Sequence, residues 1–390
     1  MLNDIEIKIP EPKWGSNLTG IILKLEKLRS NQSVGEVPKW IFLQLKDIFQ
    51  ILETFGSARI EGNNTTLSEY VEKIIEKSAY KDESQKEIEN LDEAIKWIED
   101  QTDENTKFTR AYISEVHKII TKELTPPPHG EGSMYPGELR KHNVHIKKSS
   151  HIPPDAAALR DHFDSFLNFI NQSWPEQYQL LMIAIAHHRF AYIHPFDNGN
   201  GRMGRLLNYA LLIKIGFRVK DLRIINPSSI FYNDREKYYN FLSRADSLKD
   251  EDLLQWSEYF LSGLKDEIEK IDHFLVKKYV QQSLLLPAIS FSLDRKQITD
   301  REYQILKYLI LKDDMTMKSE ELKIFGITNS VQKSRTMSRM KEKNMIKPIE
   351  TKERIYTINF ANNYLLRGII KSLESEKFIP EFLNKNENRL

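Results

Sequence analysis

We interpret this 390-residue chain outward from one stretch, His194-Pro195-Phe196-Asp197-Asn198-Gly199-Asn200-Gly201-Arg202-Met203-Gly204-Arg205. Its glycine-rich part runs into an apolar-periodic segment that begins at Met203, which predicts a tight loop opening a helix. The first N–H groups of a helix and its dipole together form an anion site. Arg202 and Arg205 stand three apart on one helix face, where two guanidinium groups can hold phosphate oxygens. His194 titrates near neutrality, as a base for a hydroxyl nucleophile should.

Each of these features has an ordinary explanation when taken alone. A lone histidine is more often packed or capping than catalytic, and glycine-asparagine runs are usually turns. Their conjunction within twelve consecutive residues favours a phosphate site with its own base.

The stretch resembles the signature of the Fic family, His-x-Phe-x-acid-Gly-Asn-Gly-Arg-x-x-Arg. The resemblance implies a mostly α-helical fold. It also implies transfer of AMP from ATP to a Ser, Thr or Tyr hydroxyl of a target protein, and the chain itself is expected to be one of these targets. It also implies that His194 deprotonates this hydroxyl. The residues expected to bind the phosphates are Gly199, Asn200, Gly201, Arg202, Met203, Gly204 and Arg205.

One position departs from the signature. The acidic residue that binds Mg²⁺ in the family is replaced by Asn198, with Asp197 one residue earlier. Hard cations such as Mg²⁺ or Mn²⁺ prefer anionic oxygen, although an amide oxygen can also coordinate them. We therefore expect a weakened metal site, formed by Asn198 or, after a shift of the loop, by Asp197.

A second motif lies upstream, at Ser57-Ala58-Arg59-Ile60-Glu61-Gly62. Its ordinary interpretation is a helix that ends at Gly62 with a glycine cap. It also resembles the inhibitory-helix motif of Fic proteins that carry their inhibitor before the core. This resemblance implies that Glu61 pairs with Arg205, and that Ser57, one helical turn earlier, faces the same side.

Two further segments fit the same interpretation. Val144 and Ile146 alternate with polar neighbours, which predicts a short strand or hairpin edge; in the family the corresponding flap pairs with the target segment. The family's adenine pocket is bordered by a tyrosine pair, so Tyr239 is expected to contact the base, with Asn233 nearby. Asp246 falls where some members place a base-contacting asparagine. A helical tyrosine pair is otherwise ordinary packing.

The expected organisation is an N-terminal helical region with the inhibitory helix (1–105), a Fic core with a short β-hairpin flap (106–275), a winged helix-turn-helix domain (276–375) and a tail (376–390). The chain has no cysteine, which fits a reducing, cytoplasmic location. It begins without a long apolar run, and no stretch reaches the length of a membrane span, so neither a signal peptide nor a membrane partner is expected.

The net charge of +1 hides an uneven distribution. Residues 291–390 contain 20 Lys and Arg against 14 Asp and Glu, and the remainder contains 37 against 42. The order of helices and alternating segments in this basic part resembles a winged helix, whose third helix would place Lys333, Arg335 and Arg339 on DNA phosphates. The alternative is a protein-contact or structural module with a solvated basic face.

Three functions stay open at this point. The first is a protein adenylyltransferase that is autoinhibited by Glu61. A second is a DNA-binding regulator whose core senses nucleotide with weak or no catalysis, an alternative that Asn198 keeps open. The third is removal of AMP from a modified protein, with Glu61 orienting the water.

Overall fold

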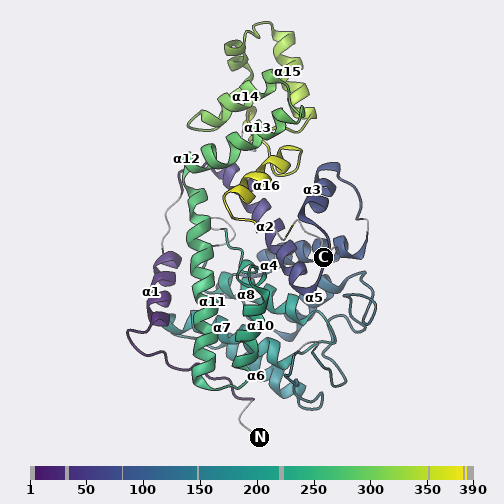
Figure 1. Ribbon diagram of the computed structural model, residues 1–390, viewed down its shortest axis with the longest axis vertical. Coiled ribbons are helices and arrows are strands. Elements are labelled where there is room, and N and C mark those ends of the chain that lie inside the picture. Colours follow the sequence, from purple (N-terminus) through teal and green to yellow (C-terminus); the bar gives the residue numbers. More distant parts are fainter. Residues whose placement is uncertain are drawn as a thin grey trace. The chain divides into compact units, whose positions relative to one another are not determined.

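The computed structural model of the chain describes residues 5–30, 35–80, 82–146, 149–218, 224–349, 352–380 and 383. Its elements divide between two compact units (Figure 1). Unit 1 comprises Met1–Gln32, Ile51–Asn63 and Lys81–Lys270, and unit 2 comprises Ser33–Gln50, Asn64–Tyr80 and Ile271–Leu390. Each unit is therefore assembled from segments that are far apart in the sequence.

The regular elements described in unit 1 are helices. They are α1 (Asn17–Ser30), the second half of α2 (Lys39–Glu61), α4 (Glu83–Gln101), α5 (Arg110–Thr121), α6 (Leu159–Asn171), α7 (Glu176–Ile193), α8 (Asn200–Lys214), α9 (Ser229–Tyr232), α10 (Arg235–Ala245) and α11 (Asp250–Ile271).

Helices α7 and α8 form the centre of unit 1. Both are buried over most of their length, as expected for helices that are apolar on nearly every face. They pack against each other, while α6 packs on α7, and both α4 and α5 pack on α8. Trp256 of α11 is fully buried and donates from its indole N–H to the carbonyl of Ala184 at 2.6 Å. The loop between α7 and α8, which carries the signature, is thus mounted on the most rigidly packed part of the unit.

Unit 2 combines helices with one small sheet. Besides the first half of α2, its elements are α3 (Leu67–Glu76), η1 (Asp272–Leu275), α12 (Lys277–Tyr279), η2 (Val280–Leu285), α13 (Leu286–Asp294), α14 (Asp300–Leu311), β1 (Thr316–Lys318), η3 (Ser319–Phe325), α15 (Ser330–Glu342), β2 (Ile346–Ile349), β3 (Lys352–Ile358) and α16 (Leu365–Ser375).

The sheet is antiparallel, with strand order β1-β3-β2. Thr316 pairs with Thr357, and Ile346 pairs with Ile358. The first half of α2 is joined to the end of β3 by Gln44, which donates to the carbonyl of Ile358 at 3.0 Å and accepts from the N–H of Phe360 at 2.9 Å. A fully buried glutamine that is satisfied at both ends fixes this helix within unit 2.

The mostly helical class expected from the sequence is confirmed, but the strand expected at Val144 and Ile146 is wrong for the described residues. Residues 143–146 and 149–154 form no strand, and residues 147 and 148 lie outside the described part. Arg140 holds this segment instead, because its guanidinium donates to the carbonyls of His142 and Pro154. Among the described helices, none combines the length and apolar character needed to cross a membrane.

Candidate functional site

His194 stands at the junction where α7 ends. It adopts a left-handed backbone (φ 50°, ψ 62°), and its N–H still donates to the carbonyl of Phe190 at 3.0 Å. On the side chain, Nδ1 lies 3.4 Å from the carbonyl oxygen of Ala191. A carbonyl can only accept, so this contact places the proton on Nδ1 and leaves Nε2 as the basic nitrogen. Burial lowers the pKa of His194 to about 4, so the ring is neutral at neutral pH.

The loop after His194 is shaped by Gly199 and Asn200. Gly199 is left-handed (φ 76°), a conformation that glycine adopts without strain, and α8 begins at the next residue. The Asn200 side chain accepts from the N–H of Phe196 and donates to its carbonyl, both at 2.9 Å. This side chain therefore braces the loop and does not point into a ligand site. Met203 and Gly204 lie buried in the first turn of α8.

Arg205 is fully buried and is bound by the upstream motif. Its Nε donates to Ser57 Oγ at 2.8 Å, and its Nη2 donates to the Ser57 carbonyl at 3.0 Å and to Glu61 Oε1 at 2.6 Å. Burial alone would raise the pKa of Glu61, but the charge and hydrogen bond of Arg205 outweigh it and lower that pKa. The contact expected between Glu61 and Arg205 is therefore present, with Ser57 on the same side.

Gly201 makes room for this contact. A Cβ built at this position would collide with Oε1 of Glu61 and lie 3.3 Å from Nη1 of Arg205. The Glu61 carboxylate therefore lies directly against the backbone of the loop that was expected to cradle phosphate.

The half of α2 that carries Ser57 and Glu61 is also anchored one turn earlier. Buried Glu53 accepts from the N–H of Ser228 at 2.9 Å and from its hydroxyl at 2.6 Å. Gly56 packs so closely on the Tyr232 ring that any side chain would collide with it. Burial raises the pKa of Glu53 to about 7. The position of the motif relative to Arg205 is thus fixed by contacts along the helix.

Arg202 has partners that the sequence did not indicate. Its Nη1 lies 2.9 Å from Oε1 of Glu87 on α4, and its Nη2 donates to the carbonyl of Glu131 at 2.6 Å. Glu87 is 3% exposed, and Asn63 donates to its other oxygen at 2.7 Å. Burial raises the pKa of Glu87, an effect that Arg202 and Asn63 only partly offset. Asn63 comes directly after the motif, so the end of the motif segment is tied to Arg202 through Glu87.

The two residues expected to bind a metal differ in what they offer. The Asp197 carboxylate accepts from the Ser133 hydroxyl at 2.6 Å and from the Met134 N–H at 2.8 Å, so both its oxygens are engaged. The Asn198 amide nitrogen donates to the carbonyl of Gly132 at 3.1 Å, which leaves its oxygen as the donor atom for a cation. An amide oxygen suits a hard divalent cation but carries no charge. The Asn198 oxygen is therefore better placed for a cation than the engaged Asp197 carboxylate, and a metal at either residue stays a prediction.

The three residues expected at the adenine pocket have different surroundings in the structure. Tyr239 is 40% exposed, and burial together with the nearby Glu61 carboxylate raises its pKa, so it borders the Arg205 site. Asp246 lies 3.1 Å from Nε2 of buried His188 and is engaged by it. Asn233 lies at the end of α9 and faces a different cavity.

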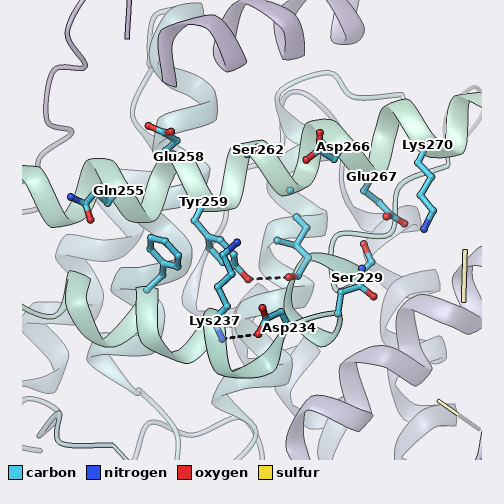
Figure 2. Close-up of a pocket in the computed structure, with 14 residues that line it drawn as sticks. Ser229, Asp234, Lys237, Gln255, Glu258, Tyr259, Ser262, Asp266, Glu267 and Lys270 are labelled. Atoms are coloured by element: carbon cyan, nitrogen blue, oxygen red, sulfur yellow. Dashed lines mark hydrogen bonds between the residues drawn. The ribbon is translucent and has the colours of Figure 1, made fainter. Parts of the chain in front are cut away.

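That other cavity has a volume of about 620 Å³ and lies between α9, α10 and α11 (Figure 2). Its polar lining includes Asp234, Lys237, Glu267 and Lys270. Glu267 is 7% exposed, and its burial raises its pKa to about 7. Its lining includes no residue of the signature, so it is separate from the site around His194.

In unit 2, the basic residues of α15 differ in their exposure and in their partners. Arg335 is exposed, and Lys333 is half-buried. Arg339 lies 3.1 Å, and Lys343 3.0 Å, from the carboxylate of Glu302, whose side chain is fully buried. The hydrogen bonds and charges of Thr299, Lys343 and Arg339 outweigh burial and lower the pKa of Glu302. Arg339 thus compensates an internal charge, in contrast to Arg335.

Two kinds of comparison place this geometry among known proteins. A profile of the Fic/DOC family matches residues 107–212. The chain is 30% identical over 196 residues to protein adenylyltransferase Fic of Nematostella vectensis and 33% identical over 200 residues to that of Drosophila erecta. Each alignment covers 49% of this chain and, respectively, 42% and 36% of the relative. The chain therefore spans less than half the length of these curated relatives.

Solved structures share the fold. A Fic family protein from Desulfovibrio desulfuricans matches with a TM-score of 0.55 at 19% identity, covering 90% of this chain and 98% of that chain. A Fic domain containing signaling protein from Bacteroides thetaiotaomicron gives a TM-score of 0.51 at 18% identity, covering 67% of this chain and 98% of that chain. Residues 107–212, which include His194 and the two arginines, therefore match the Fic/DOC family, and the relatives that align with about half of the chain are protein adenylyltransferases.

Proposed function

We propose that this protein transfers AMP from ATP to a hydroxyl side chain of a protein, and that Glu61 holds it in an inhibited state. The observation that carries the proposal is the joint arrangement of three parts. A histidine with a basic Nε2 precedes the anion-binding start of a helix, and the first guanidinium groups of that helix are engaged by carboxylates of the same chain. A base beside an anion site is the minimum that phosphoryl chemistry on a hydroxyl requires.

In the proposed reaction, Nε2 of His194 accepts the proton of the target hydroxyl. The hydroxyl oxygen attacks the α-phosphorus of ATP, its new bond forms as the bond to the β-phosphate oxygen breaks, and pyrophosphate leaves. The N–H groups at the start of α8 stabilise the charge on the phosphates. Arg202 and Arg205 orient the β- and γ-phosphates. A divalent cation held through Asn198 would neutralise part of the phosphate charge.

Inhibition follows from the position of Glu61. The carboxylate occupies Nη2 of Arg205, and it would repel a γ-phosphate that approached the same group. ATP bound beside Glu61 would have its α-phosphate misaligned for in-line attack, and a displacement of about 1 Å can cost around 10²-fold in rate. Tyr239 and Asp246 are proposed to border the adenine, with a weaker proposal for Asn233, which lines the separate cavity between α9, α10 and α11.

Mass spectrometry of the purified chain after incubation with ATP and Mg²⁺ tests the proposal. We expect AMP on a Ser, Thr or Tyr of the chain in the Glu61→Gly variant, and none after His194→Ala is added to it. Label transfer to a panel of other proteins would reveal targets. If both variants bind ATP and neither ever carries AMP, the proposal is wrong, and a nucleotide sensor is the better description.

A second function is favoured by the order of elements in unit 2. The succession α14, β1, η3, α15, β2 and β3 is the order of a winged helix, so we also propose residues 276–375 as such a domain, with α15 as the DNA-contacting helix. Binding of the full chain to duplex DNA at low salt would support it, and no binding there would favour a structural module. Release of AMP from a modified protein would reveal the reverse reaction.

A further inference from the structure

The signature lacks an acidic residue at the position that binds the metal, and the structure places another carboxylate beside the gap. Asn198 occupies this position, and Asp197 is engaged by Ser133 and Met134. Oε2 of Glu131 lies 3.4 Å from the amide nitrogen of Asn198 and 3.4 Å from Nη2 of Arg202. No spacing in the sequence connects Glu131, which lies 67 residues upstream, with the signature.

The backbone around Glu131 is fixed from several sides. Asp197 holds Ser133 and Met134, Asn198 donates to the carbonyl of Gly132, and the N–H of Gly132 donates to Thr125 at 2.8 Å. A Cβ at Gly132 would collide with the carbonyl oxygen of Leu124, so the backbone passes through a space that only glycine fits. Asp197 therefore acts on this site indirectly, because it holds the loop that presents Glu131.

Glu131 is one carboxylate more than the single positive charge of Arg202 can neutralise. The Arg202 guanidinium already has the buried carboxylate of Glu87 as its partner at 2.9 Å. Glu131 is a second carboxylate on the same cation, and its side chain is 47% exposed, so it can turn without leaving a buried charge behind. A surplus carboxylate 3.4 Å from the amide nitrogen of Asn198 can reach a cation bound at the oxygen of the same amide, at a site expected to receive polyphosphate.

We propose that Glu131 supplies the charged ligand of the divalent metal that the signature of this chain no longer supplies. The inference rests on the proposed function, because the metal is expected to arrive with ATP. One carboxylate, one amide oxygen, substrate phosphates and waters are the ligand set that Mg²⁺ commonly takes in nucleotide sites.

The test measures metal binding and not transfer. Mn²⁺ is titrated into the full-length Glu61→Gly protein with a non-hydrolysable ATP analogue, and the unbound Mn²⁺ is quantified by electron paramagnetic resonance. Glu131→Gln should weaken Mn²⁺ binding by at least about 10- to 100-fold, because loss of a residue that merely orients a ligand already costs a metal site that much. Glu138→Gln is the matched control, because Glu138 lies in the same segment and is exposed beside Lys141, and it should change nothing.

A reciprocal variant separates coordination from loop damage. Adding Asn198→Asp to Glu131→Gln returns a carboxylate to the same space and should restore Mn²⁺ affinity. Unchanged Mn²⁺ affinity in Glu131→Gln would overturn the inference, as would a loss that Asn198→Asp does not restore. Tighter binding of the analogue to Glu131→Gln at saturating Mn²⁺ would also overturn it, because a ligand of the metal cannot be lost with a gain in affinity for the metal complex. If no variant binds the analogue at all, the proposed function itself is wrong.

Discussion

The signature loop of unit 1 and helix α15 of unit 2 both gather cations, but they use them differently. In the loop, Arg202 and Arg205 are each 1% exposed, and each has a carboxylate of the same chain as its partner. At the end of α15, Arg339 and Lys343 share the buried carboxylate of Glu302, although the Arg339 side chain is 49% exposed, and Arg335 is exposed as well. The number of cations in a segment therefore does not measure how well it binds anions. Anion binding depends on which cations are already neutralised by the chain.

The two carboxylates that bind the arginines of the signature also differ. The Glu61 side chain is 27% exposed at the last residue of α2, whereas that of Glu87 is 4% exposed within α4. A phosphate can displace a partly exposed carboxylate at a helix end far more readily than a buried one. We therefore assign Glu61 a regulatory role and Glu87 a structural one, and the following predictions separate these roles.

The largest effect is expected at His194, which distinguishes a catalytic loop from one that only binds anions. In the Glu61→Gly background, His194→Ala should lower transfer by about 10²- to 10⁴-fold and leave ATP affinity largely intact, because the base acts on the hydroxyl. Rates from labelled ATP and affinities from calorimetry check this. An undiminished rate would remove His194 as the base.

The same site predicts a pH profile. A histidine acts as a base only when it is neutral, and burial lowers the pKa of His194 to about 4. The single-turnover rate should therefore stay level between about pH 7.5 and 5.5 and fall only as the pH approaches that pKa. A fall centred at the ordinary histidine pKa of about 6.5 would contradict the burial seen here.

Glu87→Gln tests whether the second carboxylate is structural. Removing one partner of a buried ion pair typically costs about 3–5 kcal/mol, so the free energy of unfolding should drop by about that amount. Glu93→Gln on the same helix is the control, because its 3.7 Å pair with Lys122 is exposed and should contribute less than about 1 kcal/mol. Urea unfolding measures both. A change in activity without a loss of stability would instead assign Glu87 the regulatory role proposed for Glu61.

Glu61→Gly should raise transfer by about 10²-fold and cost less stability than Glu87→Gln, because the Glu61 side chain is 27% exposed and Arg205 keeps both of its bonds to Ser57. Ser57→Ala should activate less, since it leaves the carboxylate in place. If wild type and Glu61→Gly carry equal amounts of label, the segment from Ser57 to Gly62 is only the end of a helix and does not inhibit.

The smallest effect is expected on α15. If the full chain binds DNA, Lys333→Ala and Arg335→Ala should each make the slope of the logarithm of the binding constant against the logarithm of the salt concentration less steep. The change should be about 0.9 for every DNA phosphate that the variant no longer neutralises. Arg339→Ala should instead act through the buried charge of Glu302 and lower the melting temperature. Equal slopes for Arg335→Ala and Arg339→Ala would erase the distinction drawn between these cations.

Apolar periodicity predicted the helices around the site, and glycines marked where these helices begin or end. Gly199 is left-handed where α8 begins, and Gly62, with φ 102°, follows the last residue of α2. Strands were harder to predict. The three residues of β1 are stabilised by pairing with β3, some 40 residues later, which no local pattern reveals. At Val144 and Ile146 the alternation was real, but contacts from Arg140 replace a strand partner.

The partners of Arg202 show what else the sequence concealed. Glu87 was detectable in principle, because it lies in line with the apolar residues Leu91, Ala94 and Ile98, all of them buried, on one face of α4. A charged residue in such a stripe requires a buried counterion. Glu131 gave no comparable signal, since loop geometry alone brings it to Asn198.

Gly201 has a consequence for how such a protein can mutate. The inhibited state places the Glu61 carboxylate against this glycine, and the proposed active state would place a phosphate there. A larger residue at position 201 would expel the inhibitor and also block the substrate, so a substitution there cannot raise activity. Substitutions at Glu61 remove the inhibitor alone. A lineage can therefore gain constitutive activity through Glu61 but not through position 201, and Gly201 is expected to persist in active and inhibited descendants alike.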